Sequence, residues 1–595
     1  NFRVAGNMMK EKKAKGSAYT APTYTFRGFE ALPDDPKHPD DDKFYGFVFQ
    51  DTDFSKWIEA VAYSLAQHPD EKLEATADEA IDIVCAAQRE YGYLDTYYII
   101  NGMDQSFTNL KDHHELYCLG HLVEGAVAYY EATGKDKLLK AACRFADYVD
   151  SYFGPEEGKC KGYPGHEIAE MALVRLYQVT GEEKYLKLSS FFLNQRGTEP
   201  KYFRLEDEAR AKAEGTSFKP DMSPLSYSYY QAHARVQSQD EALGHSVRAA
   251  YLYSGMADVA RLTNDEEMYA ACKSLWKSVT RDKMYVTGGI GATHMGEAFS
   301  FPFDLPNDTA YSETCAAIGL AFFARRMLEI EADSHYGDVL EQSLYNTVLS
   351  GMALDGKSFF YVNPLESKGD HHRQEWYGCA CCPSQLSRFL PSIGNYIYAS
   401  SDDALWVNLY IGNTGQIRIG ETDILLTQET DYPWDGSVKL TISTSQPLEK
   451  EIRLRIPNWC KTYDLSINGK RINVSEEKGY AVIKDWKSQD VIALDMDMPV
   501  EIVAADPHVK ENFGKRAIQR GPLVYCMEEI DNPVYFDQIQ LSPSTTFQTA
   551  FASDILNGIK TIKTNGRAQS ATFIPYYAWD NRKAGKMRVW IPYNE

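Results

Sequence analysis

The stretch ELYCLGHLVEGAVAYYEATG, residues 115–134, places apolar residues at three- and four-residue spacing and ends on Gly134. This spacing predicts an α-helix, and glycine is a common residue just after a helix end. Residues 52–67 and 71–88 show the same spacing. The sequence therefore predicts helix after helix between residues 50 and 400.

A weak internal repeat accompanies these helices. Each copy ends one helix, turns at Thr-Gly or Thr-Asn, and starts the next helix with acidic residues. The copies are EATGKDKLL (131–139), QVTGEEKYL (178–186), RLTNDEEMY (261–269) and a fainter EIEADSHYGDVL (329–340). Recurrent helix–turn–helix units are typical of an open solenoid or of a closed α/α toroid.

The spacing of the copies is irregular, and two inserted loops, 199–227 and 288–313, explain the irregularity. Long loops at one end of a compact scaffold are where a site is usually built. We therefore favour a closed (α/α)6 barrel over a solenoid.

After residue 400 the period of the apolar residues changes to two. The alternating segments are 404–411, 416–428, 437–445, 451–457 and 464–472, and Asn468-Gly469 is a turn signal. This pattern predicts an antiparallel sandwich. A second small β unit is expected from 517–528 onward, and 586–592 reads as one more strand that returns to the first sandwich.

The expected fold class is multidomain α plus β: an (α/α)6 barrel followed by antiparallel β-sandwich domains. The barrel is predicted over 1–400, and its first residues are candidates for joining the sandwich. The first sandwich is predicted over 401–505, with 581–595 returning to it, and the second over 506–580. A chain of 595 residues is too long for one ordinary core, which agrees with several domains.

Composition narrows the possible partners and locations. A formal net charge of −22 argues against nucleic-acid and anionic membrane partners, since no excess of basic groups is present to neutralise phosphates. No stretch approaches the ~20 apolar residues of a transmembrane helix. The polar start NFRVAGNMMKEKKAKG does not read as a signal peptide, although it begins at Asn1 and a leader removed beforehand stays open. The 11 cysteines cannot all pair, which favours metal or catalytic use and the cytoplasm.

The densest chemistry lies in residues 296–319 and 375–398. Zinc favours four ligands drawn from Cys, His and carboxylate groups. Such a set is available in Glu313, Cys315, Cys381 and Cys382. Pro383 suits the first turn of a helix, whose positive end would lower the pKa of the preceding thiols. Two other interpretations stay open, namely buried core cysteines and a structural zinc in which Cys379 replaces Glu313.

A general acid is also available. Glu297 could protonate a leaving oxygen at the mouth of the barrel, helped by the acidic residues Asp304, Asp308 and Glu313 around it. Its alternative is an ordinary solvated glutamate. Several histidines lie on or beside predicted inner helices and would line a polar pocket suited to hydroxyl groups, unless each is a satisfied core residue; they are His114, His121, His166 and His245.

At these residues the sequence resembles glycoside hydrolase family 127, the β-L-arabinofuranosidases. The matching stretches are HELYCLGHLVEGAVAYYEATG (114–134), PGHEIAEMALVRLYQVTG (164–181), GHSVRAAYLYSGMADVA (244–260), TGGIGATHMGEAFSFPFDLPNDTAYSETCAAIGL (287–320), YGCACCPSQLSRFLPSIGNYIY (377–398) and QRGPLVYCMEE (519–529). One departure is that Pro383-Ser384-Gln385 stands where the family often has Pro-Pro-Asn, which bears on nearby substrate contacts.

The resemblance implies a zinc-dependent retaining exo-glycoside hydrolase, an (α/α)6 barrel with β-sandwich domains, and a homodimer. Carried over residue by residue, it makes Cys381 the nucleophile and Glu297 the acid/base. It makes zinc ligands of Glu313, Cys315, Cys381 and Cys382, and sugar contacts of His114, His166, His245 and Tyr361.

Three rival interpretations stay open. A glycosidase could use two carboxylates, Glu297 with Glu313, and keep zinc as scaffold. A sugar epimerase or a lyase-like enzyme for uronic acids could use the same barrel. A non-catalytic carbohydrate-binding protein could hold a structural zinc. The expected partner in each case is a small sugar or an oligosaccharide, and the sequence does not fix which sugar.

Overall fold

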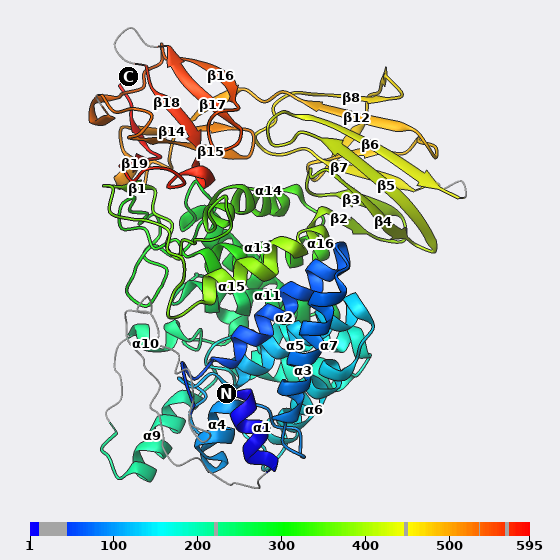
Figure 1. The fold of residues 1–595 in the computed structure, drawn as a ribbon, viewed down its shortest axis with the longest axis vertical. Coiled ribbons are helices and arrows are strands. Elements are labelled where there is room, and N and C mark those ends of the chain that lie inside the picture. The colour runs from blue at the N-terminus through cyan, green and yellow to red at the C-terminus, as the bar shows by residue number, and fades with distance from the viewer. Residues whose placement is uncertain (11–43, 219–223, 446–449, 535, 566–569, 595) are drawn as a thin grey trace. The chain divides into compact units, whose positions relative to one another are not determined.

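The computed structural model describes residues 1–10, 44–218, 224–445, 450–534, 536–565 and 570–594. The chain forms two compact units. Figure 1 shows the ribbon coloured by residue number from the N-terminus to the C-terminus. We call Asn1–Arg281, Met295–Ser300 and Gln374–Ser392 the helical unit. We call Asp282–His294, Phe301–Arg373 and Ile393–Glu595 the mixed unit.

The helical unit consists of inner helices that are buried on nearly all sides and outer helices that bury one face. Its helices are α1 (Phe2–Lys10), α2 (Asp51–Gln67), α3 (Glu71–Ala86), α4 (Thr96–Asn101), α5 (Glu115–Thr133), α6 (Lys137–Tyr152), α7 (Ala169–Thr180), α8 (Glu183–Gln195), α9 (Tyr202–Glu214), α10 (Pro224–Tyr229), α11 (Ser246–Thr263), α12 (Glu266–Lys277) and α15 (Cys381–Phe389).

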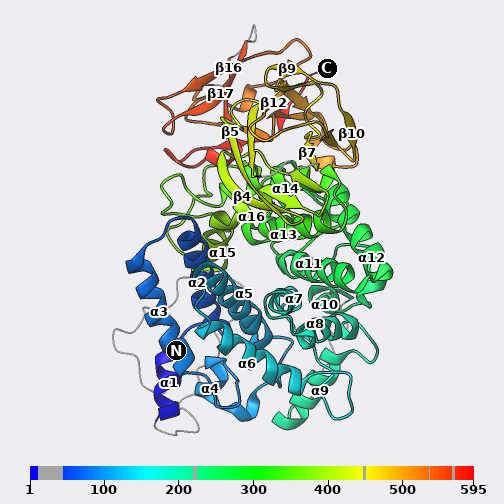
Figure 2. The same cartoon turned by 90° about the vertical axis from the view of Figure 1, so that its right-hand side faces the viewer.

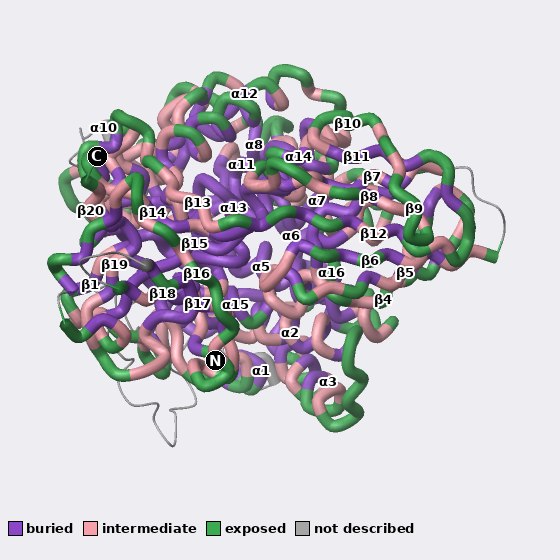
Figure 3. Tube along the Cα trace, turned by 90° about the horizontal axis from the view of Figure 1, so that it is seen from above, coloured by how far each residue is buried: buried purple, intermediate pink, exposed green. Residues whose placement is uncertain are grey.

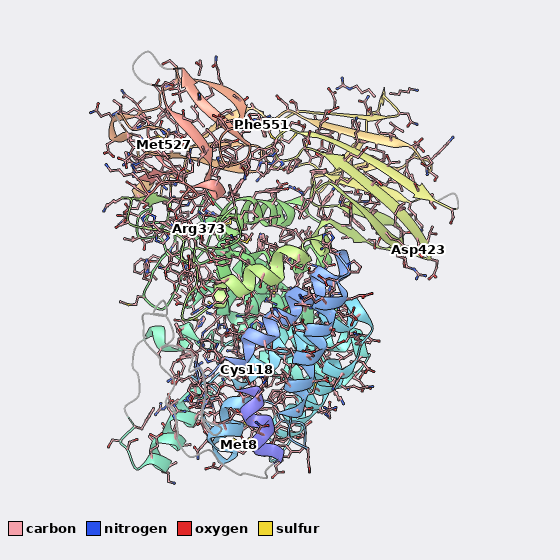
Figure 4. The ribbon with its side chains drawn as sticks, viewed as in Figure 1. Met8, Cys118, Arg373, Asp423, Met527 and Phe551 are labelled. Atoms are coloured by element: carbon pink, nitrogen blue, oxygen red, sulfur yellow. The ribbon has the colours of Figure 1, made fainter. Side chains whose placement is uncertain are left out.

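Inner and outer helices alternate along the chain. Helix α5 packs between α2 and α7, α7 packs on α11, and α15 packs on α2, while α6, α8 and α12 each return along the inner helix before them (Figure 2). The inner helices α5 and α11 bury every residue from Glu115 to Tyr129 and from Ser246 to Ala260, so most of their trace is purple in Figure 3. Cys118 of α5, labelled in Figure 4, is one of these buried residues.

The repeat seen in the sequence is the common end of three inner helices. Thr133, Thr180 and Thr263 each donate their hydroxyl to the backbone oxygen four residues earlier, at 2.6, 2.7 and 2.7 Å. The next residues, Gly134, Gly181 and Asn264, have φ of 73°, 75° and 55°. Glycine and asparagine tolerate this left-handed conformation, which ends a helix. Together with the sheets described below, the alternation confirms the predicted (α/α)6 barrel with β-sandwich domains.

Glycines let the inner helices approach closely. A Cβ added at Gly125 of α5 would lie 2.6 Å from the backbone oxygen of Ser55 in α2, and one at Gly120 would lie 2.9 Å from the nitrogen of Ala169 in α7. Backbone atoms cannot swing aside as a side chain can, so a methyl group at these positions would push two helices apart.

Gly125→Ala is therefore expected to destabilise the protein by about 1–3 kcal/mol and to lower the midpoint of thermal unfolding. Gly394→Ala is the matched control, because nothing lies within 4 Å of a Cβ added there and glycine is the poorer helix former. Equal midpoints for the two variants would show that α2 and α5 can separate without cost.

Within its described residues, the mixed unit holds three α-helices and the strands. Its helices are α13 (Thr314–Ile330), α14 (Ser334–Ser343) and α16 (Gly394–Ile397). A five-stranded sheet has the order β10-β11-β7-β3-β2, from β2 (Tyr398–Ser400), β3 (Ala404–Val407), β7 (Glu451–Arg455), β10 (Ser475–Glu477) and β11 (Tyr480–Ile483). A six-stranded sheet has the order β4-β5-β6-β12-β8-β9, from β4 (Asn413–Ile419), β5 (Thr422–Thr430), β6 (Ser437–Thr444), β8 (Tyr463–Ile467), β9 (Lys470–Arg471) and β12 (Val491–Met496).

A nine-stranded sheet contains the remaining strands. They are β1 (Glu366–Ser367), β13 (Val500–Val503), β14 (Lys515–Arg520), β15 (Leu523–Glu528), β16 (Thr546–Ala552), β17 (Ile559–Asn565), β18 (Thr572–Pro575), β19 (Met587–Arg588) and β20 (Ile591–Pro592). Pairing is antiparallel except between β3 and β7. In the nine-stranded sheet, strands β15, β18 and β19 contribute residues to a hydrophobic core that contains Trp579 and Trp590.

Several details of the sequence prediction are wrong. The closing strands β19 and β20 pair with β1, β15 and β14 and not with the first sandwich, because alternation identifies a strand but not its partner. Residues 416–428 lie in a hairpin of β4 and β5 that turns at Gly420, not in one strand.

The chain start and the first inserted loop also differ from the prediction. The first described residues form helix α1, which packs on α3 and α4, and no strand. The inserted loop 199–227 contains helix α9, since its run EDEARAKAE is rich in helix formers; residues 219–223 of that loop lie outside the described residues. Within the described ranges, no helix combines the length and apolar character needed to cross a bilayer.

Candidate active site

Three histidines stand at the starts of three inner helices in the helical unit. His114 and His245 are the residues before α5 and α11, and His166 lies just before α7. Their rings form a row, with centroids 5.6 Å apart from His114 to His166 and 5.6 Å apart from His166 to His245. The predicted histidines are therefore neighbours.

The tautomer of His245 follows from its contacts. Its Nδ1 accepts hydrogen bonds from the backbone N–H groups of Val247 and Arg248, at 3.2 and 3.3 Å, so Nδ1 caps α11 and carries no hydrogen. The hydrogen is then on Nε2, which lies 3.0 Å from Oε2 of Glu297. His245 is therefore a neutral donor to the predicted acid.

The backbone holds Glu297 in an unusual conformation. Its φ of 52° is left-handed, which is uncommon for a residue with a side chain and is typical of functional sites. The carbonyl oxygen of Glu297 accepts from the backbone N–H and the hydroxyl of Ser246, both at 3.0 Å. The side chain of Glu297 remains 33% exposed, against 7% for His245, so a substrate oxygen can reach the carboxyl group.

His114 and His166 have the opposite tautomer. Nδ1 of His114 donates to the carbonyl oxygen of Asp112 at 2.9 Å, and Nδ1 of His166 donates to that of Glu167 at 3.0 Å. Their Nε2 atoms are therefore acceptors. Burial, followed by the nearby Arg248 charge, holds the pKa of both imidazoles well below the usual value, so both stay neutral.

Arg248 is held by aromatic rings and a carbonyl. Its guanidinium lies 4.7 Å from the Tyr229 ring centroid and 4.9 Å from that of Tyr230, and it donates to the oxygen of Gly165. The Tyr229 ring also packs on His245, with centroids 5.5 Å apart. Arg248 thus connects the loop before α7 to the start of α11.

The cysteine pair opens α15. Cys381 and Cys382 are its first two residues and Pro383 is the third, which confirms the predicted helix start. Their sulfur atoms lie 4.0 Å apart; Cys382 is buried and Cys381 is half-buried. Two thiols at a helix N-terminus lie in a positive field, which favours the thiolate.

Cys379 lies beside this pair. The pKa of the Cys379 thiol is raised above its usual value. The largest cause is a hydrogen bond with Cys381, followed by burial and by the charges of Cys381 and Glu297, while the charge of Lys56 opposes the shift. Cys379, Cys381 and Cys382 therefore gather at the start of α15 in the helical unit.

Sequence reasoning missed Lys56, and it named His121 as a candidate pocket residue without placing it among the family's sugar contacts. Lys56 of α2 is only 2% exposed, and its Nζ lies 5.7 Å from the Tyr117 ring centroid. His121 is fully buried 4.5 Å from that ring, and burial, then Lys56, holds its pKa well below the usual value. No pattern in the sequence marks Lys56, which the structure buries on the face of α2 that also carries Thr52 and Glu59.

In the mixed unit, the predicted ligands Glu313 and Cys315 lie at the start of α13. Glu313 is the residue before the helix and both side chains are buried. The segment that carries Tyr361 pairs with the start of α13. The backbone N–H of Thr314 donates to the carbonyl oxygen of Tyr361 at 3.0 Å, and Glu313 forms an antiparallel β-bridge with Val362. Tyr361 is itself buried.

Comparisons with known proteins cover nearly the whole chain. Residues 4–395 match the catalytic domain of the β-L-arabinofuranosidase family GH127, residues 404–498 its middle domain, and residues 500–592 the C-terminal domain of glycoside hydrolase family 127. A non-reducing end β-L-arabinofuranosidase of Bifidobacterium longum subsp. longum is 39% identical, over 92% of this chain and 90% of that protein.

Solved structures agree with these matches. The crystal structure of a GH127 β-L-arabinofuranosidase from Geobacillus stearothermophilus T6 is 46% identical, with a TM-score of 0.89 over 93% of this chain and 92% of that one. A second structure, of a GH127 β-arabinofuranosidase, is 39% identical, with a TM-score of 0.84 over 100% of this chain and 94% of that one. The chain therefore belongs to glycoside hydrolase family 127, the β-L-arabinofuranosidase family, and is a glycoside hydrolase.

Proposed function

We propose that this glycoside hydrolase is a zinc-dependent, retaining, exo-acting β-L-arabinofuranosidase in which Cys381 is the nucleophile and Glu297 the general acid and base. The observation that carries the proposal is the hydrogen bond between His245 and Glu297 at the end of the row of three histidines, in the same unit whose helix α15 opens with Cys381. The named activities of the relatives, which match over more than nine-tenths of the chain, support the substrate class.

The proposed zinc ligands are Glu313, Cys315, Cys381 and Cys382. Glu313 and Cys315 lie at the start of α13 in the mixed unit, and Cys381 and Cys382 open α15 in the helical unit. A carboxylate with three sulfurs is a donor set that zinc accepts. A bound zinc ion would keep the coordinating thiols ionised at neutral pH. The set therefore fits the metal that the family resemblance implies.

The protein side chains carry out two displacements. In the first, the Cys381 thiolate forms a bond to the anomeric carbon as the bond to the leaving oxygen breaks, and Glu297 gives that oxygen its proton. In the second, Glu297 takes a proton from water, the water oxygen bonds to the anomeric carbon, and the carbon–sulfur bond breaks to return the thiolate. Two inversions retain the anomeric configuration.

The histidines and Tyr361 are proposed to bind the sugar. The Nε2 atoms of His114 and His166 can accept hydrogen bonds from sugar hydroxyl groups, since neither imidazole is protonated near neutral pH. His245 donates to Oε2 of Glu297, so the proton that the acid transfers is carried by Oε1. We place Tyr361 among these contacts from the family resemblance.

His245→Asn separates the two roles of His245. An asparagine side chain is a good helix cap but is too short to reach Glu297, so the unfolding midpoint is expected to stay near that of the wild type. The bond from His245 strengthens as Glu297 gives up its proton and becomes a carboxylate. A hydrogen bond to a charged group is worth about 1.5–3 kcal/mol, so its loss is expected to lower kcat/KM by about 10- to 100-fold.

His245→Ala is the comparison variant for this experiment. It should lose the same activity and also about 1 kcal/mol of stability, because the cap is lost as well. Wild-type kcat/KM in His245→Asn would show that the bond to Glu297 has no catalytic role.

The direct test combines a substrate panel with metal analysis on one sample. Of a set of nitrophenyl furanosides and pyranosides, the β-L-arabinofuranoside should be hydrolysed fastest, with about one zinc per chain. Removal of zinc by a chelator should abolish hydrolysis, and added zinc should restore it. Full activity without metal would overturn the zinc assignment, and a trapped sugar on Glu313 would favour the two-carboxylate mechanism.

We further propose a cytoplasmic homodimer. No disulfide joins any of the 11 cysteines, all of which lie in the described residues, and this suits a reducing compartment. Fractionation of expressing cells would test the location. Sedimentation equilibrium would distinguish the 67.3 kDa chain from its dimer.

A further inference from the structure

A chain of buried ion pairs connects the inner helices of the helical unit. Arg388 of α15 donates to Oε2 of Glu59 in α2 at 2.7 Å. Arg175 of α7 lies 3.8 Å from the other oxygen of Glu59 and 2.7 Å from Glu124 of α5. Its second nitrogen pairs with Glu131 of α5 at 2.8 Å.

These charges are buried at a high desolvation cost. Arg388 is 2% exposed, Glu59 4% and Glu124 5%, whereas the Glu131 side chain at the outer end is 52% exposed. A buried ion pair often adds no net stability compared with apolar residues of similar size. The presence of this pair is better explained by the geometry that directional hydrogen bonds impose.

The chain of ion pairs contacts the helices that carry the candidate site. Helices α5 and α7 follow His114 and His166, and Arg388 also approaches the Tyr251 hydroxyl of α11, the helix that begins after His245, at 3.5 Å. Arg388 follows Cys381 by seven residues, which places both on the same face of α15.

The Arg388 guanidinium is fixed in orientation as well as in place. Its Nε donates to Oε1 of Gln385 at 2.7 Å while Nη1 donates to Glu59. The Tyr63 hydroxyl donates to Glu59 at 3.3 Å and holds that carboxylate in turn. A fork with fixed partners prevents a short helix from rotating or sliding, which apolar packing alone does not.

We propose that Arg388 and Glu59 are positioning residues: they set the rotation and depth of α15 and thereby the direction of the Cys381 and Cys382 sulfur atoms. This inference rests on the proposed function, since it concerns the sulfurs that are to bind zinc and attack the sugar. The proposal gives the buried pair of Glu59 in α2 and Arg388 in α15 a role in holding the metal and in setting kcat.

The test uses Arg388→Met, Glu59→Gln and Arg388→Lys, with Glu131→Gln as the control from the exposed end of the same chain. Metal retention is measured as zinc transfer to a chromogenic chelator, and geometry as the visible absorption of the cobalt-substituted protein. Loss of a residue that orients metal ligands typically costs about 10- to 100-fold in affinity or activity.

The expected result is a loss of that size in zinc retention for Arg388→Met and Glu59→Gln. Their cobalt bands should shift, and kcat should fall more than KM rises. Arg388→Lys keeps the charge but loses the fork, so it should lie between Arg388→Met and the wild type. Glu131→Gln should match the wild type in all readouts.

A double variant, Glu59→Leu with Arg388→Met, guards against misfolding, because removal of both charges together avoids an unpaired buried ion. It should recover the unfolding midpoint but not the cobalt spectrum. Recovery of the spectrum, or wild-type zinc retention and kcat in both single variants, would overturn the positioning role. A wild-type protein without stoichiometric metal would instead refute the proposed zinc site.

Discussion

Cys381→Ala is expected to lower kcat by about 10⁴-fold or more, because loss of a nucleophile removes the covalent route entirely. The zinc ion should remain, held by Glu313, Cys315 and Cys382, with weaker affinity. Measurement of kcat on an aryl β-L-arabinofuranoside and of zinc content on the same sample separates the loss of the nucleophile from the loss of the metal.

Two control variants sharpen this experiment. Cys379→Ala removes the neighbouring thiol, and it should retain most of the activity if Cys379 is neither nucleophile nor ligand. Cys460→Ala removes a half-buried thiol of the mixed unit and should behave as the wild type. Full activity in Cys381→Ala would remove the nucleophile assignment, and loss of zinc in Cys379→Ala would favour the four-sulfur site.

The parts of the fold that depend on local sequence were predictable. The ends of α5, α7 and α11 follow from Thr-Gly and Thr-Asn, because a threonine hydroxyl and a residue with positive φ complete the last turn without help from the rest of the chain. Pro383 in the first turn of α15 follows from the geometry of proline in the same way.

The parts that depend on distant segments were not predictable. The hydrogen bond between His245 and Glu297 joins residues 52 apart in sequence, and no period or motif encodes it. The pairing of β19 and β20 is set by which sheet edge is available, and alternation is silent on that choice. The proposed site residues follow from the family resemblance, whereas the histidine tautomers and the contacts of Arg388 are visible only in the folded structure.

Glu297→Gln is expected to lower kcat/KM by about 10²- to 10⁴-fold for substrates with a poor leaving group, the range typical of a lost general acid. Glutamine keeps the shape of the side chain and still accepts a hydrogen bond from Nε2 of His245 at the position of Oε2. The variant should therefore fold normally and bind zinc as the wild type does.

The leaving group distinguishes a proton donor from a merely structural glutamate. A nitrophenolate leaves without protonation, so the first displacement by Cys381 should be nearly normal in Glu297→Gln, whereas an alkyl or sugar leaving group should depend on the acid. The second displacement also loses its base, so an initial burst of nitrophenol followed by slow turnover is expected. A small anion such as azide, which needs no base, should accelerate that slow phase and give a glycosyl azide with the original configuration. Equal losses for all leaving groups, with no rescue by azide, would assign the proton transfer to another residue.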